Sequence, residues 1–280
     1  MNNILICSDL DRTILANGKE PHSPEALPVL HHLAECEEIT LVYVSGRNEK
    51  LLKDATRKFG IPVPDYAIGD VGTTIYEPPG NWHPWDDWTQ EIARDWQGKT
   101  GVDLARLFTD VDGIRLQEPE KQNTYKLSYY ADAAADSTAL RKEIRKRLEP
   151  AGIETSIIWS IDEEKNVGLL DILPKRATKV HAIHFVMKKR GFAEDRCVFA
   201  GDSGNDLPAL TSGLNAVLVK NGREEVRREA VAVMEKRGMR ERLYLAQGDF
   251  YGMNGNYCAG VLEGIAHFLP ETLLLMGLEK

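Results

Sequence analysis

Short apolar runs that end in polar residues alternate with helix-like segments in the first and last thirds of the chain. Ile4–Cys7, Ile39–Val44 and Cys197–Ala200 are too short for helices and consist almost entirely of apolar residues, which is typical of strands buried on both faces of a parallel sheet. Parallel strands need crossover connections, usually helices. The alternation therefore predicts an α/β fold with a doubly wound, Rossmann-like parallel sheet.

Helix-capping residues mark the expected crossover helices. Asn48 and Thr178 are N-cap candidates, and Gly60 and Gly191 follow the last apolar positions of the same segments, as expected at helix C-termini. Ser23-Pro24 predicts a further helix start, with proline at the first helical position.

The middle of the chain follows a different pattern. A hairpin is expected between Tyr66–Ile68 and Thr73–Tyr76, and the alternation stops soon after it. Strand-like runs at Lys126–Tyr130 and Thr155–Ser160, with a charged helix around Arg141–Leu148, indicate an inserted α+β domain. The predicted division is a core of residues 1–79 and 174–280 and a cap domain of residues 80–173.

Charge and hydropathy exclude several classes of partner. The chain has 35 Lys and Arg against 43 Asp and Glu, a formal net charge of −8, whereas nucleic-acid binding needs clustered positive charge. No run approaches the ~18 apolar residues of a membrane span, and the four cysteines show no paired spacing. We expect a cytoplasmic protein with reduced cysteines that binds neither nucleic acid nor a membrane.

Two carboxylates follow the first apolar run. Asp9 and Asp11 lie two positions apart where a strand ends, and ligands of open α/β sheets bind beyond the carboxyl ends of the strands. One carboxylate can attack phosphorus as a nucleophile while the other transfers a proton. Taken alone, the pair is more typical of a solvated turn than of a catalytic site.

A second acidic motif follows another apolar run. Asp202 and Asp206 suit a hard cation that prefers oxygen ligands, and Gly201 and Gly204 permit a tight turn around them. By itself the motif could be an acidic glycine-rich loop. Paired with the first acidic strand end, it predicts a shared site.

Two further segments complete a candidate phosphate site. The hydroxyl of Ser45 and the backbone N–H groups of Gly46 and Arg47 follow a third strand at a helix start, where anions bind. Lys179 lies in the first turn of the helix predicted after Thr178, where its charge can stabilise a phosphoryl oxygen.

The order of these four motifs resembles the haloacid-dehalogenase superfamily, in its branch with a large α/β cap between the second and third motifs. The resemblance implies Asp9 as nucleophile and Asp11 as general acid/base, with Mg²⁺ as cofactor. It also implies metal binding by Asp9, the Asp11 backbone carbonyl and Asp202, phosphoryl binding by Ser45 and Lys179, and support from Asn205 and Asp206.

Within that branch the chain is most similar to the sucrose-phosphate phosphatases. The matching segments are 69–76, Gln122 with 126–130, 171–174 leading to Lys179, and 257–261. The chain has Lys121-Gln122-Asn123 where the plant and cyanobacterial enzymes have Glu-Gln-Arg. The resemblance implies that these positions face the sugar, which makes Gln122 a candidate substrate-binding residue. Lys126 and Arg47 are further candidates.

The predicted reaction is hydrolysis of a sugar phosphate, sucrose 6-phosphate first. Mannosylfructose, glucosylglycerol and trehalose phosphates, a phosphomutase reaction, and a weakly active module that docks on a sugar-phosphate synthase are the alternatives. Trp85, Trp88 and Trp96, near helical spacing, are expected to pack a cap helix rather than stack on sugar. His181 and His184 lack the companions of a zinc site.

Overall fold

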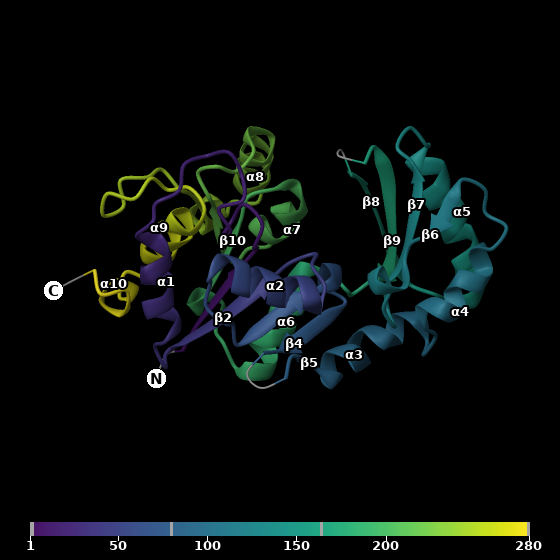
Figure 1. The fold of residues 1–280 in the computed structure, drawn as a ribbon, viewed down its shortest axis with the longest axis horizontal. Helices are drawn as coiled ribbons and strands as arrows, with labels where there is room; N and C mark the ends of the chain where they lie inside the picture. The colour runs from purple at the N-terminus through teal and green to yellow at the C-terminus, as the bar shows by residue number, and fades with distance from the viewer. Residues whose placement is uncertain (1–2, 79–80, 163–164, 279–280) are drawn as a thin grey trace.

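A computed structural model describes residues 3–78, 81–162 and 165–278. Two bodies lie side by side, a larger one that contains both ends of the chain and a smaller one formed by the middle of the sequence (Figure 1). The larger body is built on an eight-stranded sheet with the order β12-β11-β10-β1-β2-β3-β4-β5. These strands are β1 Ile4–Ser8, β2 Ile39–Val44, β3 Tyr66–Gly69, β4 Thr74–Glu77, β5 His83–Pro84, β10 Cys197–Gly201, β11 Asn215–Leu218 and β12 Leu243–Leu245.

The central strands of this sheet are parallel and covered on both faces. From β12 to β3 every neighbouring pair is parallel, and β3, β4 and β5 are joined by antiparallel pairing. Ile4 and Ile6 face one apolar layer while Leu5 and Cys7 face the other, which explains the unbroken apolar run of β1. The predicted doubly wound α/β fold is confirmed.

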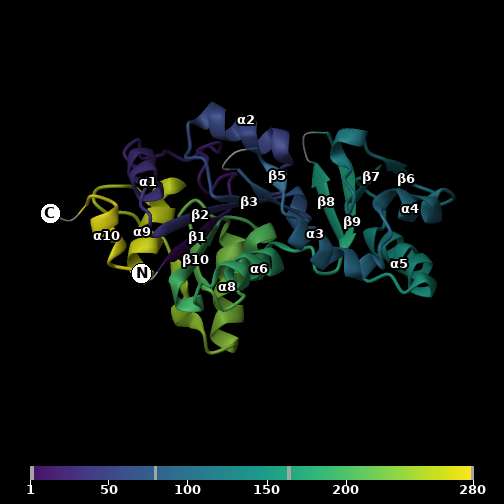
Figure 2. The same cartoon turned by 90° about the horizontal axis from the view of Figure 1, so that it is seen from below.

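The covering helices form one layer on each face, as Figure 2 shows for α1 and α2 against α6 and α8. The first layer holds α1 Ala26–Ala34, α2 Glu49–Phe59, α9 Cys258–Phe268 and α10 Thr272–Leu275, and the second holds α3 Asp86–Ala93, α6 Lys179–Arg190, α7 Leu207–Leu210 and α8 Glu224–Lys236. None of the helices in the described part of the chain has the length and hydropathy required to traverse a bilayer.

The predicted helix caps are confirmed. The Asn48 side chain accepts a hydrogen bond from the Leu51 N–H at 3.0 Å, and the Thr178 hydroxyl accepts one from the His181 N–H at 3.1 Å. Gly60, with φ of 61°, ends α2. The predicted start of α1 at Ser23-Pro24 is wrong, because these residues form a turn and the helix begins at Ala26.

The smaller body is a four-stranded antiparallel sheet with helices on one side. Its strand order is β6-β7-β9-β8. The elements are α4 Gly101–Ala105, β6 Ile114–Leu116, β7 Leu127–Asp132, α5 Ser137–Leu148, β8 Thr155–Asp162 and β9 Val167–Pro174. Trp96, Leu104 and Phe108 pack in its own apolar core.

The first part of the segment assigned to the cap adjoins the large sheet. The proposed boundary at residues 79 and 80 lies outside the described residues, but β5 pairs with β4 and α3 packs on the core. Trp85 stacks on Tyr66 at a ring-centroid distance of 5.4 Å, and Trp88 is fully buried in the core layer. The expected packing of Trp85 and Trp88 within the cap is therefore wrong. Only Trp96 fits that prediction.

Candidate active site

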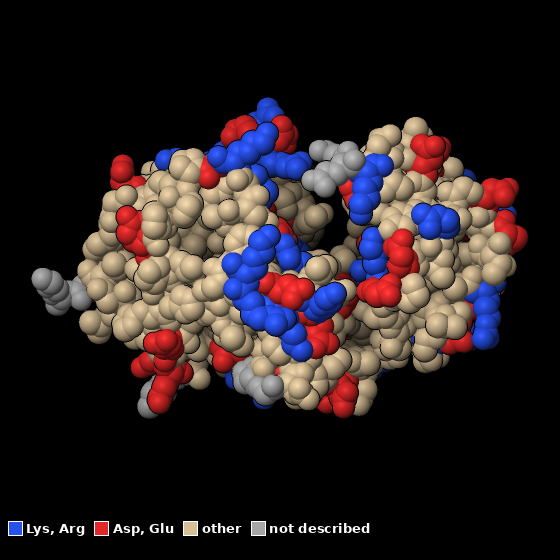
Figure 3. Space-filling view, viewed as in Figure 1, with Lys and Arg blue, Asp and Glu red and all other residues tan. Residues whose placement is uncertain are grey.

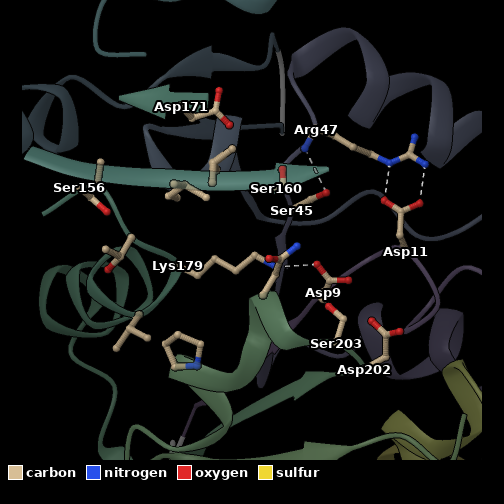
Figure 4. A pocket seen from close by; sticks show the side chains of 18 of the residues that line it. Asp9, Asp11, Ser45, Arg47, Ser156, Ser160, Asp171, Lys179, Asp202 and Ser203 are labelled. Carbon is tan, nitrogen blue, oxygen red and sulfur yellow. Dashed lines mark hydrogen bonds and ion pairs between the residues drawn. The ribbon is translucent and has the colours of Figure 1, made fainter. Parts of the chain in front are cut away.

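The two carboxylates after β1 point to different partners. The Asp9 backbone N–H continues the sheet by donating to the Ala200 carbonyl at 2.9 Å. Its side chain is buried and faces Lys179, whereas the Asp11 side chain turns toward Arg47 (Figure 4). The two carboxylates, although two residues apart, therefore have different partners and do not meet at one point.

The loop after β10 is closed by Asp206. One Asp206 carboxylate oxygen accepts from the backbone N–H groups of Asp202 and Ser203, each at 3.2 Å, and from the Ser203 hydroxyl at 3.1 Å. A Cβ atom on Gly201 would lie 2.6 Å from the Asp206 Cβ, which real Cβ contacts do not tolerate. Glycine is thus required at the strand end for Asp206 to fold back against it.

Asp9, Asp202 and Asp206 converge at the carboxyl ends of β1 and β10. Ligand oxygens of the three carboxylates lie within 4.8 Å of one another, and all three residues are buried. The Lys179 ammonium bridges Asp9 at 2.8 Å and Asp206 at 2.7 Å. Four residues from three separate parts of the sequence therefore form one charged cluster at the base of a pocket.

This crowding shifts the pKa values of two carboxyl groups. Burial raises the pKa of Asp9 to about 8, with further increases from Asp206 and Asp202, although Lys179 opposes the rise. Burial and the charge of Asp206 raise the pKa of Asp202 to about 6, against the opposing charge of Arg12. Ionising all of these groups is unfavourable without another cation, and a set of carboxylate oxygens suits a hard divalent ion. The residues thus fit a divalent metal.

Asp11 is held outside this cluster. Arg47 donates to both Asp11 oxygens, from Nε at 2.8 Å and from Nη2 at 2.6 Å, and Asn17 donates at 2.7 Å. Burial alone would raise the pKa of Asp11, but the hydrogen bonds and charge of Arg47 outweigh it and lower that pKa. The Asp11 carboxylate is therefore ionised and paired.

The remaining predicted phosphate ligands line the same pocket. This pocket has a volume of about 1040 Å³ and lies between the core and the cap, where Figure 3 shows a hollow with Lys and Arg on its rim. The buried Ser45 hydroxyl accepts from the Arg47 N–H at 3.2 Å, and Gly46 and the exposed Asn205 complete this part of the wall.

The cap contributes a wall that the sequence analysis did not identify. Ser156, Ile158 and Ser160 alternate along β8 and face the pocket, together with Asp171 of β9, whose carboxylate accepts from the Ser128 hydroxyl. The period-two spacing of the β8 residues was the available signal, but it does not show which face of the strand meets the core.

The predicted sugar ligands Gln122 and Lys126 lie elsewhere. Neither is among the pocket-lining residues. The Gln122 amide is engaged within the cap, where it donates to the Gln117 and Ser128 carbonyls at 3.1 and 2.9 Å and accepts from the Ser128 N–H at 2.8 Å. Lys126 lies near Asp70, where its charge opposes the increase in pKa that burial causes. Their sugar-binding role stays a prediction.

Comparison with known proteins identifies the family of this chain. The family model described as sucrose-6F-phosphate phosphohydrolase matches residues 2–269. The chain belongs to this family. As a member of the sucrose-6F-phosphate phosphohydrolase family with haloacid-dehalogenase structural neighbours, it is a phosphatase. Phosphatases of this type generally use a divalent metal, consistent with the three buried aspartates.

Individual relatives differ in length and in described activity. A Nitrosococcus oceani protein, described provisionally as a HAD-like hydrolase, is 56% identical over 96% of this chain and 72% of its own length. Sucrose-phosphatase 1 of Nicotiana tabacum is 32% identical over 80% of this chain, but the match spans only 51% of the tobacco protein. Mannosylfructose-phosphate phosphatase of Agrobacterium fabrum is 28% identical over 94% of this chain and 96% of its own.

A solved structure supports both the fold and the family. The sucrose-phosphatase of Synechocystis, determined in complex with sucrose and phosphate, superposes with a TM-score of 0.70 at 26% identity. The superposition covers 96% of this chain and 98% of the Synechocystis chain. The cap as well as the core therefore has a counterpart in that enzyme.

Proposed function

We propose that this phosphatase hydrolyses sucrose 6-phosphate to sucrose and phosphate with Mg²⁺ as cofactor. The observation that carries the proposal is the convergence of Asp9, Asp202, Asp206 and Lys179 at the base of a pocket bounded on one side by a largely polar cap wall. Family membership supports the sugar-phosphate substrate. The pocket volume of about 1040 Å³ exceeds what a monosaccharide phosphate needs and leaves room for a disaccharide.

In the proposed mechanism an Asp9 carboxylate oxygen attacks phosphorus. The bond between phosphorus and the sugar oxygen breaks, and protonated Asp11 delivers its proton to that oxygen, which gives free sugar and a phosphoaspartate. Asp11 then accepts a proton from the water that hydrolyses the phosphoaspartate, and inorganic phosphate leaves. Asp11 has to part from Arg47 before it can act as an acid, because the ion pair stabilises its charged form. Lys179 stabilises the charge that develops on the phosphoryl oxygens.

Asp9, Asp202 and the backbone carbonyl of Asp11 are the proposed ligands of Mg²⁺. When bound, Mg²⁺ supplies positive charge that offsets the carboxylates and the phosphoryl group. Both Asp206 oxygens already accept hydrogen bonds, one from Lys179 and the other from the β10 loop. We therefore assign Asp206 mainly to holding Lys179 and the loop in place.

Substrate binding divides between the two bodies. We assign the phosphoryl oxygens to the Ser45 hydroxyl, the Gly46 N–H, Asn205 and Lys179, and the sugar hydroxyls to the cap wall formed by Ser156, Ser160 and Asp171. Arg47 is positioned to contact the substrate once it releases Asp11. Gln122 and Lys126 require a rearrangement of the cap before they can contact the sugar.

A phosphate-release screen tests the proposal. Purified protein with Mg²⁺ is assayed on sucrose 6-phosphate, on mannosylfructose, glucosylglycerol and trehalose phosphates, and on hexose phosphates. Sucrose 6-phosphate should have the highest kcat/KM. Because the Agrobacterium relative matches nearly full length, mannosylfructose phosphate is the second candidate. A clear preference for it would overturn the assignment of the sugar but not that of the reaction.

Control experiments distinguish phosphatase activity that uses Asp9 from a phosphomutase reaction and from a docking module. Asp9→Ala should abolish phosphate release, and more than a few per cent of residual activity would contradict Asp9 as the nucleophile. A phosphomutase would produce isomeric sugar phosphate without net phosphate, which mass spectrometry detects. Folded protein that is inert on the whole panel but co-purifies with a sugar-phosphate synthase would favour a docking module.

A further inference from the structure

A hydrogen-bonded network connects the C-terminal segment to Asp202. Arg12 donates from Nε to one Asp202 carboxylate oxygen at 3.2 Å, and from Nη2 to Glu20 at 3.1 Å and to the Asn221 carbonyl at 3.2 Å. The second Glu20 oxygen accepts from the Tyr257 hydroxyl at 2.7 Å. Arg12 and Asp202 are 190 residues apart in the sequence, so only the fold brings them together.

The backbone of Arg12 is also held by this network. Asn221 donates from Nδ2 to the Arg12 carbonyl at 2.7 Å and accepts from the Tyr257 N–H at 2.7 Å. Arg12 and Tyr257 have φ values of 60° and 52°, a region that residues other than glycine enter only where their surroundings enforce it. Two strained residues at opposite ends of one network indicate that its geometry is strongly constrained.

The network leaves no room for extra atoms. A Cβ on Gly18 would lie 2.5 Å from Arg12 Nη1, 2.6 Å from a Glu20 oxygen and 2.6 Å from the Tyr257 hydroxyl. The hydroxyl of Tyr257, with Arg12, lowers the pKa of Glu20 to about 2, so Glu20 is ionised and pairs with Arg12 throughout the neutral range. Figures 1 and 2 both show α9, which begins just after Tyr257, beside α1.

The cluster of three carboxylates has two cationic partners in the described chain. Lys179 contacts Asp9 and Asp206, and Arg12 is the cation that contacts Asp202. Arg12 binds Asp202 through a single oxygen and leaves the other available. The guanidinium group makes these contacts from two nitrogens, Nε to Asp202 and Nη2 to Glu20 and the Asn221 carbonyl, whereas a lysine would have to make all three from one nitrogen.

We propose that Arg12 is a positioning residue for the metal-binding carboxylate of Asp202, and that Glu20 and Tyr257 act on the metal site through Arg12. The inference rests on the metal site of the proposed function. It also assigns a role to the segment 257–261, which resembles sucrose-phosphate phosphatases but does not reach the pocket.

Metal affinity distinguishes positioning from a simple charge effect. Removing a positive charge near a divalent ion would strengthen metal binding, whereas releasing Asp202 from its orientation would weaken it. Residues that orient metal ligands typically change affinity about 10- to 100-fold. We therefore expect Arg12→Gln to weaken binding about 10-fold or more, Arg12→Lys to weaken it less, and Tyr257→Phe to weaken it about threefold.

The experiment titrates Mn²⁺ into substrate-free protein and measures free Mn²⁺ by electron paramagnetic resonance. Tyr244→Phe is the matched control, because the Tyr244 hydroxyl donates to Glu263 at 2.8 Å and, within the described residues, makes no hydrogen bond to Arg12 or Glu20. Tyr257→Phe should have no further effect in an Arg12→Gln background. Circular dichroism and thermal unfolding establish that each variant is folded.

The possible results of the Mn²⁺ titration lead to different conclusions. Unchanged or tighter Mn²⁺ binding by folded Arg12→Gln would overturn the positioning role. If that variant does not fold, the Tyr257→Phe comparison decides, and an affinity equal to that of Tyr244→Phe would overturn the role. Wild-type protein that binds no Mn²⁺ would refute the proposed metal site itself.

Discussion

Replacing Asp9 with asparagine should remove catalysis and stabilise the metal-free protein. Burial raises the pKa of Asp9 from its ordinary 3.8 to about 8, so the folded protein holds a proton that the unfolded chain releases between these values. Each pH unit in that interval lowers the free energy of unfolding by about 1.4 kcal/mol relative to a group that does not titrate. Asparagine keeps nearly the same shape and does not titrate.

The expected result is therefore a difference in the free energy of unfolding between Asp9→Asn and wild-type protein that increases with pH. Coupling to Asp202 and Asp206 spreads the titration, so we expect the stability advantage of Asp9→Asn to grow by about 2 kcal/mol between pH 5 and pH 7. It should level off above pH 8. Loss of the contact with Lys179 changes the size of the advantage at every pH but not this slope, since Lys179 stays charged throughout the range.

The assay is urea unfolding of wild-type and Asp9→Asn proteins in chelator at pH 5, 6, 7 and 8. Asp54→Asn, on an exposed part of α2, is the matched control and should show no such slope. Adding Mg²⁺ should reduce or reverse the difference, because wild-type protein gains more from metal binding. A difference that is flat or falls with pH would show that the burial of Asp9 carries no such penalty.

Two further predictions concern a close contact at Gly201 and the accessibility of the cysteines. Gly201→Ala should lower the free energy of unfolding by about 1–3 kcal/mol because the new Cβ collides with Asp206. Gly204→Ala, which meets no atom within 4 Å, is its control, and equal urea midpoints for the two variants would contradict this account. In native protein a thiol reagent should modify at most the half-buried Cys36, since the other three cysteines are buried and burial raises the pKa of Cys258 to about 12. Denaturant should expose all four thiols, and rapid labelling of two or more in native protein would refute the expectation.

The sequence alone was sufficient for features that depend on short-range interactions or on the general geometry of parallel sheets. The caps at Asn48 and Thr178 were predictable because an N-cap bond joins residues three positions apart. The meeting of Asp9 and Asp202 was predictable because neighbouring parallel strands end at the same edge of a sheet.

Features that depend on which surfaces meet could be found only in the tertiary structure. Trp88 has the spacing of a packed helix residue in either body, and only the pairing of β5 with β4 assigns it to the core. Likewise Asp11 pairs with Arg47, and Arg12 reaches Asp202, through contacts 36 and 190 residues apart. Hydrophobic periodicity records that a side chain is buried or exposed. Periodicity does not show which distant residue a side chain contacts, because these contacts depend on how the sheet, the cap and the C-terminal segment pack together.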